Sequence, residues 1–140
     1  MRAIDTNVLL RAFVLDDPAQ SQRAQDLLRT QTVYIPVTVI LELEWVLRSR
    51  YGYSPTSIAQ AMERLAVLEN AVVGDHIAVA AAAEKLRQGW DFADALHHCL
   101  AEGCDSFATF DSRLVRRAGR DATTAPPVTL LKCRATTHAN

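Results

Sequence analysis

Short apolar runs alternate with longer amphipathic segments along the whole chain. The apolar runs predict five short strands, at residues 2–5, 33–37, 71–73, 106–110 and 128–131. The segments between them carry hydrophobic positions at helical spacing and predict helices at about 7–14, 18–30, 38–50, 55–69, 76–88, 91–102 and 111–119. Short strands that alternate with helices indicate an α/β fold whose parallel sheet is covered on both faces.

The predicted helices begin at residues that are typical N-caps. Asp5, Thr38, Asp91 and Asp111 each stand just before or at a helical segment, where an Asp or Thr oxygen can accept a hydrogen bond from a backbone N–H of the first turn. Two helices are expected to open at Pro18 and Pro55, since proline is favoured in the first turn.

Length and composition fit one globular domain. The chain has 140 residues, of which 49% are hydrophobic and 22% are charged. We expect a single domain over residues 1–134 and a loose polar tail over 135–140. The formal net charge is −1, so no global field attracts nucleic acid, and any basic surface must be local.

The three cysteines indicate a reducing compartment. Cys99, Cys104 and Cys133 cannot all pair within the chain, and their spacing does not form a zinc-binding pair. The first residues lack a charged leader followed by a long apolar stretch, and the apolar run at 77–83 is too short to cross a bilayer. These features predict a cytoplasmic protein that does not contact a membrane.

Four carboxylates occupy comparable places relative to the predicted elements. Asp5 and Asp111 lie between a strand and a helix, where ligands of a parallel sheet collect. Asp94 lies at a helix start, and Glu42 lies early in a long helix. Acids that converge repel one another unless a cation holds them, and a divalent metal is the usual partner. The four acids therefore indicate metal-assisted chemistry on a phosphate.

Each acid also fits an ordinary structural role when it is taken alone. Asp5 and Asp111 fit helix N-caps. Glu42 lies at the margin of an apolar stripe, and it lacks the i,i+4 partner that Arg48 offers to Glu44, but a solvated helix edge would also accommodate it. Asp94 fits a solvated face with Asp91, His97 and His98, where we expect His98 to be exposed rather than a metal ligand or a base.

Four segments of the chain together resemble a known family. They are Ala3–Arg11 (AIDTNVLLR), Pro36–Leu43 (PVTVILEL), Asp91–Leu96 (DFADAL) and Ala108–Asp111 (ATFD). In this order, the segments resemble those of PIN-domain ribonucleases, most closely the VapC-type toxins of bacterial type II toxin–antitoxin modules. The resemblance runs from residue 2 to about 131. It implies a three-layer α/β/α sandwich with a central parallel sheet.

The resemblance also implies a metal-dependent endoribonuclease that hydrolyses phosphodiester bonds in RNA. Its metal site, for Mg²⁺ or Mn²⁺, would be formed by Asp5, Glu42, Asp94 and Asp111. Supporting groups would be Thr6, Asn7, Asp91 and Thr109. Many relatives carry another residue than Ser112 after the last acid, which affects only a substrate contact.

The same resemblance implies protein partners. They are a cognate antitoxin, which would occlude the acid site, and a second copy in a homodimer. Aromatic residues that could line a groove for such a partner are Trp45, Trp90, Tyr51 and Tyr53. For Trp45 we favour a place in the core.

A basic stripe follows the last acid. Arg113, Arg116, Arg117 and Arg120 recur at i, i+3, i+4 and i+7, on one face of the helix that Asp111 opens. This stripe could follow an RNA phosphate backbone, or it could be a solvated face with cations near a helix C-terminus.

Three other classes compete with the nuclease. A phosphatase with a strand-end Asp nucleophile would need a second acid two residues after Asp5 and a suitably placed lysine, and Asn7 and Lys85 do not meet these needs. A phospho-receiver domain lacks its acidic pair at the first strand end. A non-catalytic RNA-binding or regulatory module on the same fold is the remaining alternative, and metal-dependent cleavage separates it from the nuclease.

Overall fold

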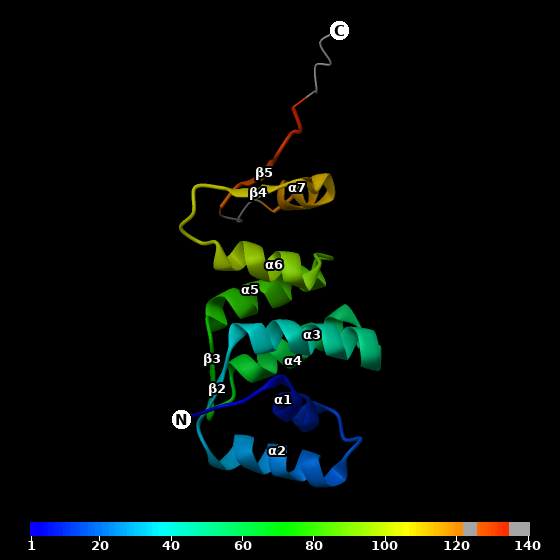
Figure 1. The fold of residues 1–140 in the computed structure, drawn as a ribbon, viewed down its shortest axis with the longest axis vertical. Coiled ribbons are helices and arrows are strands. Elements are labelled where there is room, and N and C mark those ends of the chain that lie inside the picture. Colours follow the sequence, from blue (N-terminus) through cyan, green and yellow to red (C-terminus); the bar gives the residue numbers. More distant parts are fainter. Residues whose placement is uncertain (122–125, 135–140) are drawn as a thin grey trace. The chain divides into compact units, whose positions relative to one another are not determined.

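A computed structural model describes residues 1–121 and 126–134, and it divides the chain into two compact units, residues 1–100 and 101–140 (Figure 1). Each unit has its own strands and helices and is described by itself. The single domain that we expect over 1–134 stays a prediction, and the tail at 135–140 lies outside the described residues.

The first unit contains a three-stranded parallel sheet. Its strands are β1 (Arg2–Ala3), β2 (Val33–Ile35) and β3 (Ala71–Val73), in the order β1-β2-β3. The Ile4 N–H donates to the Tyr34 carbonyl at 3.1 Å, and the Gly74 N–H donates to the Ile35 carbonyl at 2.9 Å, so the pairing continues one residue beyond β1 and β3. The three predicted strands are confirmed.

Helices connect and follow these strands, as parallel pairing requires. They are α1 (Thr6–Phe13), α2 (Pro18–Thr30), α3 (Val37–Tyr51), α4 (Pro55–Ala66), α5 (His76–Arg87) and α6 (Phe92–Leu100). Pro18 and Pro55 occupy first-turn positions, as predicted. The predicted cap at Thr38 is wrong: Pro36 is the N-cap of α3 and makes no side-chain cap bond. The fixed backbone of Pro36 starts the helix earlier, so Thr38 lies inside the first turn.

The core of the first unit is formed by aliphatic faces of its helices and by β2. α3 contributes Ile40, Leu43 and Leu47, which are all fully buried. Trp45, which we expected in the core, is 50% exposed. It points away from Leu43 and Leu47 because a separation of two residues places side chains on nearly opposite sides of a helix. Other fully buried large side chains of this unit are Leu9, Val33, Ile35, Ile58, Met62, Leu65, Phe92, Leu96 and His98.

The second unit is a small β-α-β arrangement. β4 (Phe107–Thr109) pairs in parallel with β5 (Val128–Leu130), and α7 (Ser112–Ala118) lies between them in sequence and contacts both. Leu114 and Ala118 are the buried residues of α7. Both units thus combine parallel strands with intervening helices, and the predicted α/β class is confirmed.

Two properties bear on the surroundings of the protein. Every helix within the described ranges is too short or too polar to span a bilayer. Cys104 and Cys133 are exposed free thiols. The cytoplasmic location stays a prediction.

Candidate active site

Asp5 lies where the chain passes from β1 into α1. Its Oδ1 accepts a hydrogen bond from the Val8 N–H at 3.0 Å and caps α1. Asp5 has the extended backbone conformation of an N-cap residue just before the helix. The backbone conformation and the cap bond together fix the orientation of the carboxylate. Within the described part of the chain, Oδ2 accepts no hydrogen bond, and the side chain is exposed. Asp5 is therefore an oriented carboxylate with one oxygen available to a ligand.

Glu42 is held beside the start of α1 by a contact that spans 36 residues of sequence. The Thr6 hydroxyl donates to Glu42 Oε2 at 2.7 Å. Thr6 is buried, whereas Glu42 is exposed. Since Thr6 directly follows Asp5, this bond brings Glu42 close to the segment that carries Asp5. The predicted convergence of these two acids therefore has a direct structural link.

Asp94 lies half-buried in the first turn of α6, which packs against α3. The Asp94 N–H donates to Asp91 Oδ1 at 3.0 Å, so Asp91 acts as the predicted cap. Asp91 also makes a smaller coulombic contribution to the raised pKa of Arg48, whose main cause is the hydrogen bond with Glu44. These contacts place the start of α6 beside α3, the helix that carries Glu42.

The i,i+4 pair on α3 is confirmed. Arg48 Nε donates to Glu44 Oε1 at 2.8 Å, and Glu44 is only 3% exposed. A buried carboxylate needs such a partner. Glu42 on the same helix forms no ion pair with a described residue, so its charge remains available for another cation.

Asp111 lies in the second unit, between β4 and α7. Its Oδ1 accepts hydrogen bonds from the Arg113 N–H at 2.8 Å and the Leu114 N–H at 3.3 Å. The Asp111 N–H donates to Thr109 Oγ1 at 3.0 Å. Asp111 is thus the N-cap that the sequence predicts, and Thr109 supports its backbone. All these partners are local.

The described residues do not assemble a complete metal site. Among them, no three His, Cys, Asp or Glu side chains lie in positions that could hold one ion. The donor set itself fits a hard cation, because Asp5 and Glu42 each retain a carboxylate oxygen without a described hydrogen-bond donor and Mg²⁺ and Mn²⁺ prefer oxygen. The roles of Asp5, Glu42, Asp94 and Asp111 as ligands all stay predictions.

The prediction of an exposed His98 is wrong. Its side chain is 0% exposed, and its ring stacks on Trp90 with centroids 5.6 Å apart and planes inclined by 13°. Lys85 Nζ lies 4.3 Å from the centroid of the Trp90 ring, a cation–π contact. α5 and Trp90 cover this face of α6, so the helical wheel of α6 alone could not show it. Because Trp90 is buried, it does not line an exposed partner groove.

A groove of about 700 Å³ lies between α1 and α2 and reaches Asp5. Sequence reasoning identified Asp5 and Asn7 in its wall but missed Arg2 and Arg23. The signal is a single basic position in β1 and another on the polar face of α2, and the two share one wall only when β1, α1 and α2 pack together. The other lining residues are Val8, Arg11, Gln20, Ala24, Asp26, Leu27, Thr30 and Gln31.

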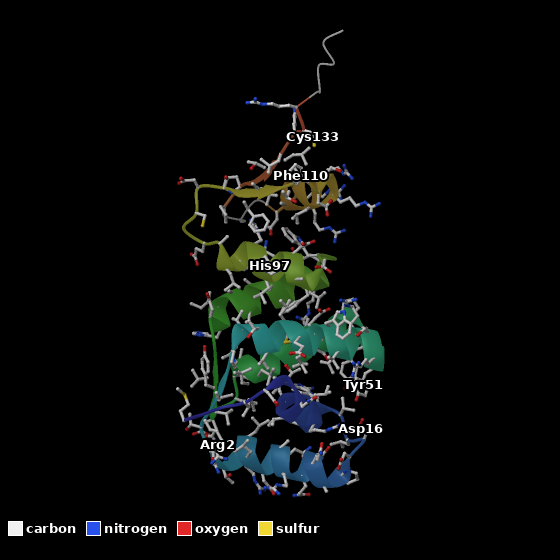
Figure 2. The ribbon with its side chains drawn as sticks, in the orientation of Figure 1. Arg2, Asp16, Tyr51, His97, Phe110 and Cys133 are labelled. Atoms are coloured by element: carbon white, nitrogen blue, oxygen red, sulfur yellow. The ribbon has the colours of Figure 1, made fainter. Side chains whose placement is uncertain are left out.

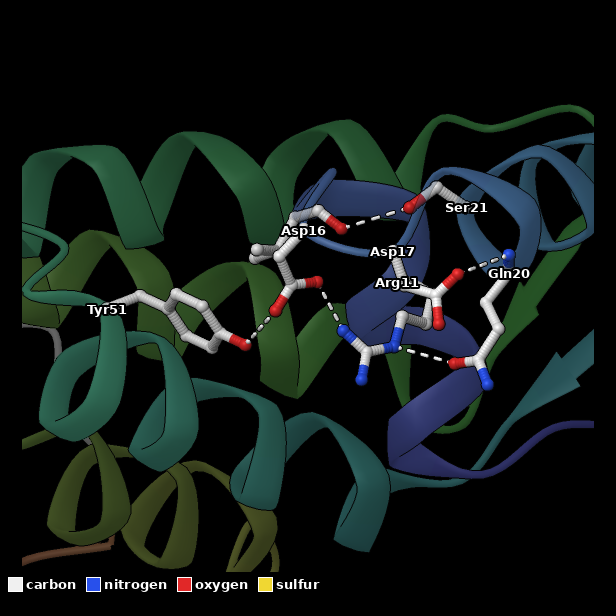
Figure 3. A network of polar contacts seen from close by, with 7 residues as sticks. Arg11, Asp16, Asp17, Gln20, Ser21 and Tyr51 are labelled. Carbon is white, nitrogen blue, oxygen red and sulfur yellow. Dashed lines mark hydrogen bonds and ion pairs between the residues drawn. The ribbon is translucent and has the colours of Figure 1, made fainter.

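A polar network joins the far end of α1 to α2 and α3 (Figure 3). Arg11 forms an ion pair with Asp16, and its Nε donates to Gln20 Oε1 at 2.9 Å. Tyr51 Oη donates to Asp16 Oδ2 at 3.1 Å. The hydrogen bond from Arg11 is the main cause that lowers the pKa of Asp16. This network fixes the α1–α2 hairpin that forms the groove.

The basic stripe predicted on α7 is one residue shorter than expected, because the helix ends before Arg120. Arg113, Arg116 and Arg117 are exposed, while Leu114 and Ala118 are buried on the other side. Arg120 lies beyond Gly119, the C-cap of α7. The separation of basic and apolar faces agrees with the sequence pattern, and the use of this face for RNA stays a prediction.

Comparison with known proteins gives one family. The model of the PIN domain matches residues 3–120. No curated protein and no solved structure matches the chain significantly. The matched range includes Asp5, Glu42, Asp94 and Asp111, and it extends over parts of both units. The α/β sandwich predicted for the chain agrees with this match. PIN domains are generally metal-dependent nucleases and typically bind divalent metal ions. The chain belongs to the PIN-domain family.

Proposed function

We propose that the protein is a metal-dependent endoribonuclease that hydrolyses phosphodiester bonds in RNA. The family membership supports a nuclease. The observation that carries the proposal for these residues is the 2.7 Å hydrogen bond from Thr6 to Glu42, which brings a distant carboxylate beside the segment of Asp5. Carboxylates gathered in this way suit a divalent cation at a phosphate.

The acids would have distinct roles. Asp5 and Asp94 would ligate one or two Mg²⁺ or Mn²⁺ ions directly, and Glu42 and Asp111 would hold a ligand water or a second ion. The ions, when bound, supply Lewis-acid chemistry: they acidify a water and neutralise charge on the phosphate.

The chain's own groups orient this chemistry. Thr6 fixes Glu42, and the cap on α1 fixes Asp5. Thr109 and the N–H groups of Arg113 and Leu114 fix Asp111, and Asp91 caps the helix of Asp94. Asn7 stands in the groove wall near Asp5. Water would be the nucleophile, since no Ser or Cys of the chain has a base at a recognisable sequence spacing.

Cleavage of a total-RNA pool by the purified protein tests the proposal. The reactions contain Mg²⁺, Mn²⁺ or EDTA, and the matched control is Asp94→Asn, which keeps the size of the side chain. We expect discrete fragments from the wild type with metal and none with EDTA or with the variant. Normal cleavage by Asp94→Asn would refute the role of Asp94. Absence of cleavage with RNA still bound would favour a non-catalytic RNA-binding module.

We further propose that this activity makes the protein the toxin of a toxin–antitoxin pair in the cytoplasm. The support is the sequence resemblance to VapC-type toxins, and the chain would form a homodimer that a cognate antitoxin neutralises. Half-exposed Trp45 and exposed Tyr51 on α3 are candidate contacts, with Tyr53 beyond the helix end.

Expression in a bacterial host tests the toxin role. Induction of the wild type alone should arrest growth, and induction of Asp94→Asn should not. Co-expression with the product of a small neighbouring gene should restore growth and yield a stable complex, and light scattering should give the mass of a dimer for the free protein. A wild type that is harmless and purifies as a monomer would contradict the toxin role and the homodimer.

The exposed arginines of α7 remain candidates for RNA binding. Replacing Arg113 and Arg116 together by Gln should weaken binding of RNA. The salt slope, which is the steepness with which the logarithm of the binding constant falls with the logarithm of the salt concentration, should decrease by roughly 0.7 per lost phosphate contact. An unchanged salt dependence would assign Arg113, Arg116, Arg117 and Arg120 to an ordinary solvated surface.

A further inference from the structure

The α1–α2 groove includes Arg2 and Arg23, which have no role in the proposed metal site. We propose that it binds the phosphate backbone of a single-stranded RNA segment that continues from the scissile bond near Asp5. The inference rests on the proposed function, since it takes RNA as the substrate. It assigns substrate binding to Arg2 and Arg23, which are distinct from the basic stripe on α7.

The groove has a defined direction relative to Asp5. At one end, the Arg2 N–H donates to the Thr32 carbonyl at 3.0 Å, so the start of β1 lies beside the end of α2. At the other end, Arg11 donates to Gln20. Figure 2 shows Arg2 and Asp16 near opposite ends of α2. α1 and α2 are therefore antiparallel. A single strand of RNA that enters at Asp5 can follow α2 for its whole length, about 20 Å for a helix of this size.

The charge of the groove favours an anion more than the chain as a whole does. Its wall contains three arginines, Arg2, Arg11 and Arg23, against two acids, Asp5 and Asp26, while the whole chain has a formal net charge of −1. Arg11 is neutralised by Asp16. Asp26 is neutralised by Arg29 at 2.7 Å. The uncompensated groups that remain are two arginines and the candidate metal ligand Asp5.

Arg2 and Arg23 are suitably free for phosphate binding. Both side chains are exposed, and neither forms an ion pair or a side-chain hydrogen bond within the described residues. An unpaired guanidinium offers planar donors that match two phosphate oxygens at once. Arg11, in contrast, is committed to the network with Asp16 and Gln20 and shapes the wall.

The remaining wall suits a single strand better than a duplex. Neighbouring packed helices have axes about 8–10 Å apart, so a groove between them is too narrow for a double helix. The amides of Asn7 and Gln31 can donate to ribose and phosphate oxygens. The Thr30 hydroxyl donates to the Asp26 carbonyl at 2.7 Å, so it can only accept, for example from a ribose hydroxyl. Val8 and Leu27 add apolar surface against which a base can lie.

The test compares two double variants with equal loss of charge. Arg2→Gln with Arg23→Gln removes the groove cations. Arg50→Gln with Arg64→Gln, at exposed positions outside the groove wall, is the control. Binding of a short fluorescein-labelled single-stranded RNA of mixed sequence is measured by anisotropy in EDTA over a range of salt concentrations. Cleavage of the same RNA is measured with Mn²⁺. Circular dichroism and thermal melting establish that both variants fold.

We expect the groove variant to bind with a salt slope lower by about 1.4, since each single-strand phosphate contact contributes about 0.7. At 0.1 M salt this slope difference corresponds to roughly a 25-fold weaker Kd. In the cleavage assay the loss should appear in KM rather than in kcat. The control variant should lose much less, because it removes charge without removing groove contacts.

The outcomes separate this inference from the proposed function. Metal-dependent cleavage by the wild type, with the groove variant equal to the control in Kd, salt slope and KM, would overturn the inference and leave the nuclease standing. The groove would then be a site for a protein segment or for none. Binding that depends on Arg2 and Arg23, without cleavage under any metal, would support the groove and refute the nuclease.

Discussion

Glu42 and Asp111 are two candidate ligands that the fold holds in different ways. Glu42 is bound by the buried hydroxyl of Thr6, 36 residues away in sequence. Asp111 is bound by backbone N–H groups two and three residues ahead of it and follows Thr109, which lies two residues behind. The environment of Asp111 is therefore local, whereas the environment of Glu42 exists only when α1 and α3 pack together.

The comparison distinguishes an acid that caps a helix from an acid that a distant side chain holds in position. A cap needs only a short polar side chain before a helix, and many sequences supply one without any catalytic role. A buried hydroxyl directed at a distant carboxylate is not required to start a helix. Substitutions that keep the cap and remove the charge can therefore measure what each acid does beyond its structural role.

The largest effect is expected from removing the charge of the two capping acids. Asp5→Asn and Asp111→Asn should each retain their cap, since Asn caps helices as well as Asp. RNA cleavage should fall by about 10²–10³-fold, the usual cost of removing one electrostatic contact from a transition state. Cleavage rates test the loss of activity, and thermal melting tests whether the cap is retained. An unchanged rate for Asp111→Asn would restrict this residue to its local cap.

Packing gives the next effect and compares the two units directly. Leu47→Ala removes a fully buried side chain of α3 and should lower the free energy of unfolding by about 3 kcal/mol. Leu114→Ala in α7, where the side chain is 6% exposed, should cost less, because its surroundings can relax toward solvent. Urea unfolding measures both. A larger cost at Leu114 would show that the small second unit depends on packing more than its size suggests.

A smaller effect is expected from the two threonines. Thr6→Val removes the donor to Glu42 and should lower metal affinity or activity by about 10–100-fold, as loss of a group that orients a ligand does. Thr6→Ser should restore it. Thr109→Val should change little, because Asp111 keeps the N–H groups of Arg113 and Leu114. Equal effects at both threonines would contradict the distinction between local and distant support.

The smallest effect concerns the network that fixes the α1–α2 hairpin. The Arg11 guanidinium holds the pKa of Asp16 below its ordinary value of 3.8. A lowered pKa stabilises the folded state above that ordinary value, and the contribution is lost as pH falls through the folded pKa. Asp16→Asn should therefore be slightly less stable than the wild type at neutral pH, and the two should converge below pH 3.8. A constant difference in thermal melting across this range would contradict the link.

The parts of the fold that depend on local sequence agree with prediction. Asp5, Asp91 and Asp111 are the expected caps, and the Glu44–Arg48 pair follows from its i,i+4 spacing. The errors concern three residues and have different causes. Thr38 has the residue type of a cap, but the proline before α3 starts the helix earlier. Trp45 is apolar, but it lies on the face of α3 opposite the core. The helical wheel of α6 places His98 on the polar face, but Trp90 covers that face.

The sequence alone is enough to predict the order of strands and helices, the family, the candidate acids and the helix caps at Asp5, Asp91 and Asp111. These follow from propensities and spacings that act within a few residues. The packing of the helices is needed to show that Thr6 reaches Glu42, that His98 is buried against Trp90, and that Arg2 and Arg23 share one groove with Asp5. Burial and hydrogen bonding between distant segments depend on which helix faces pack together, and periodicity within one helix does not specify its partner.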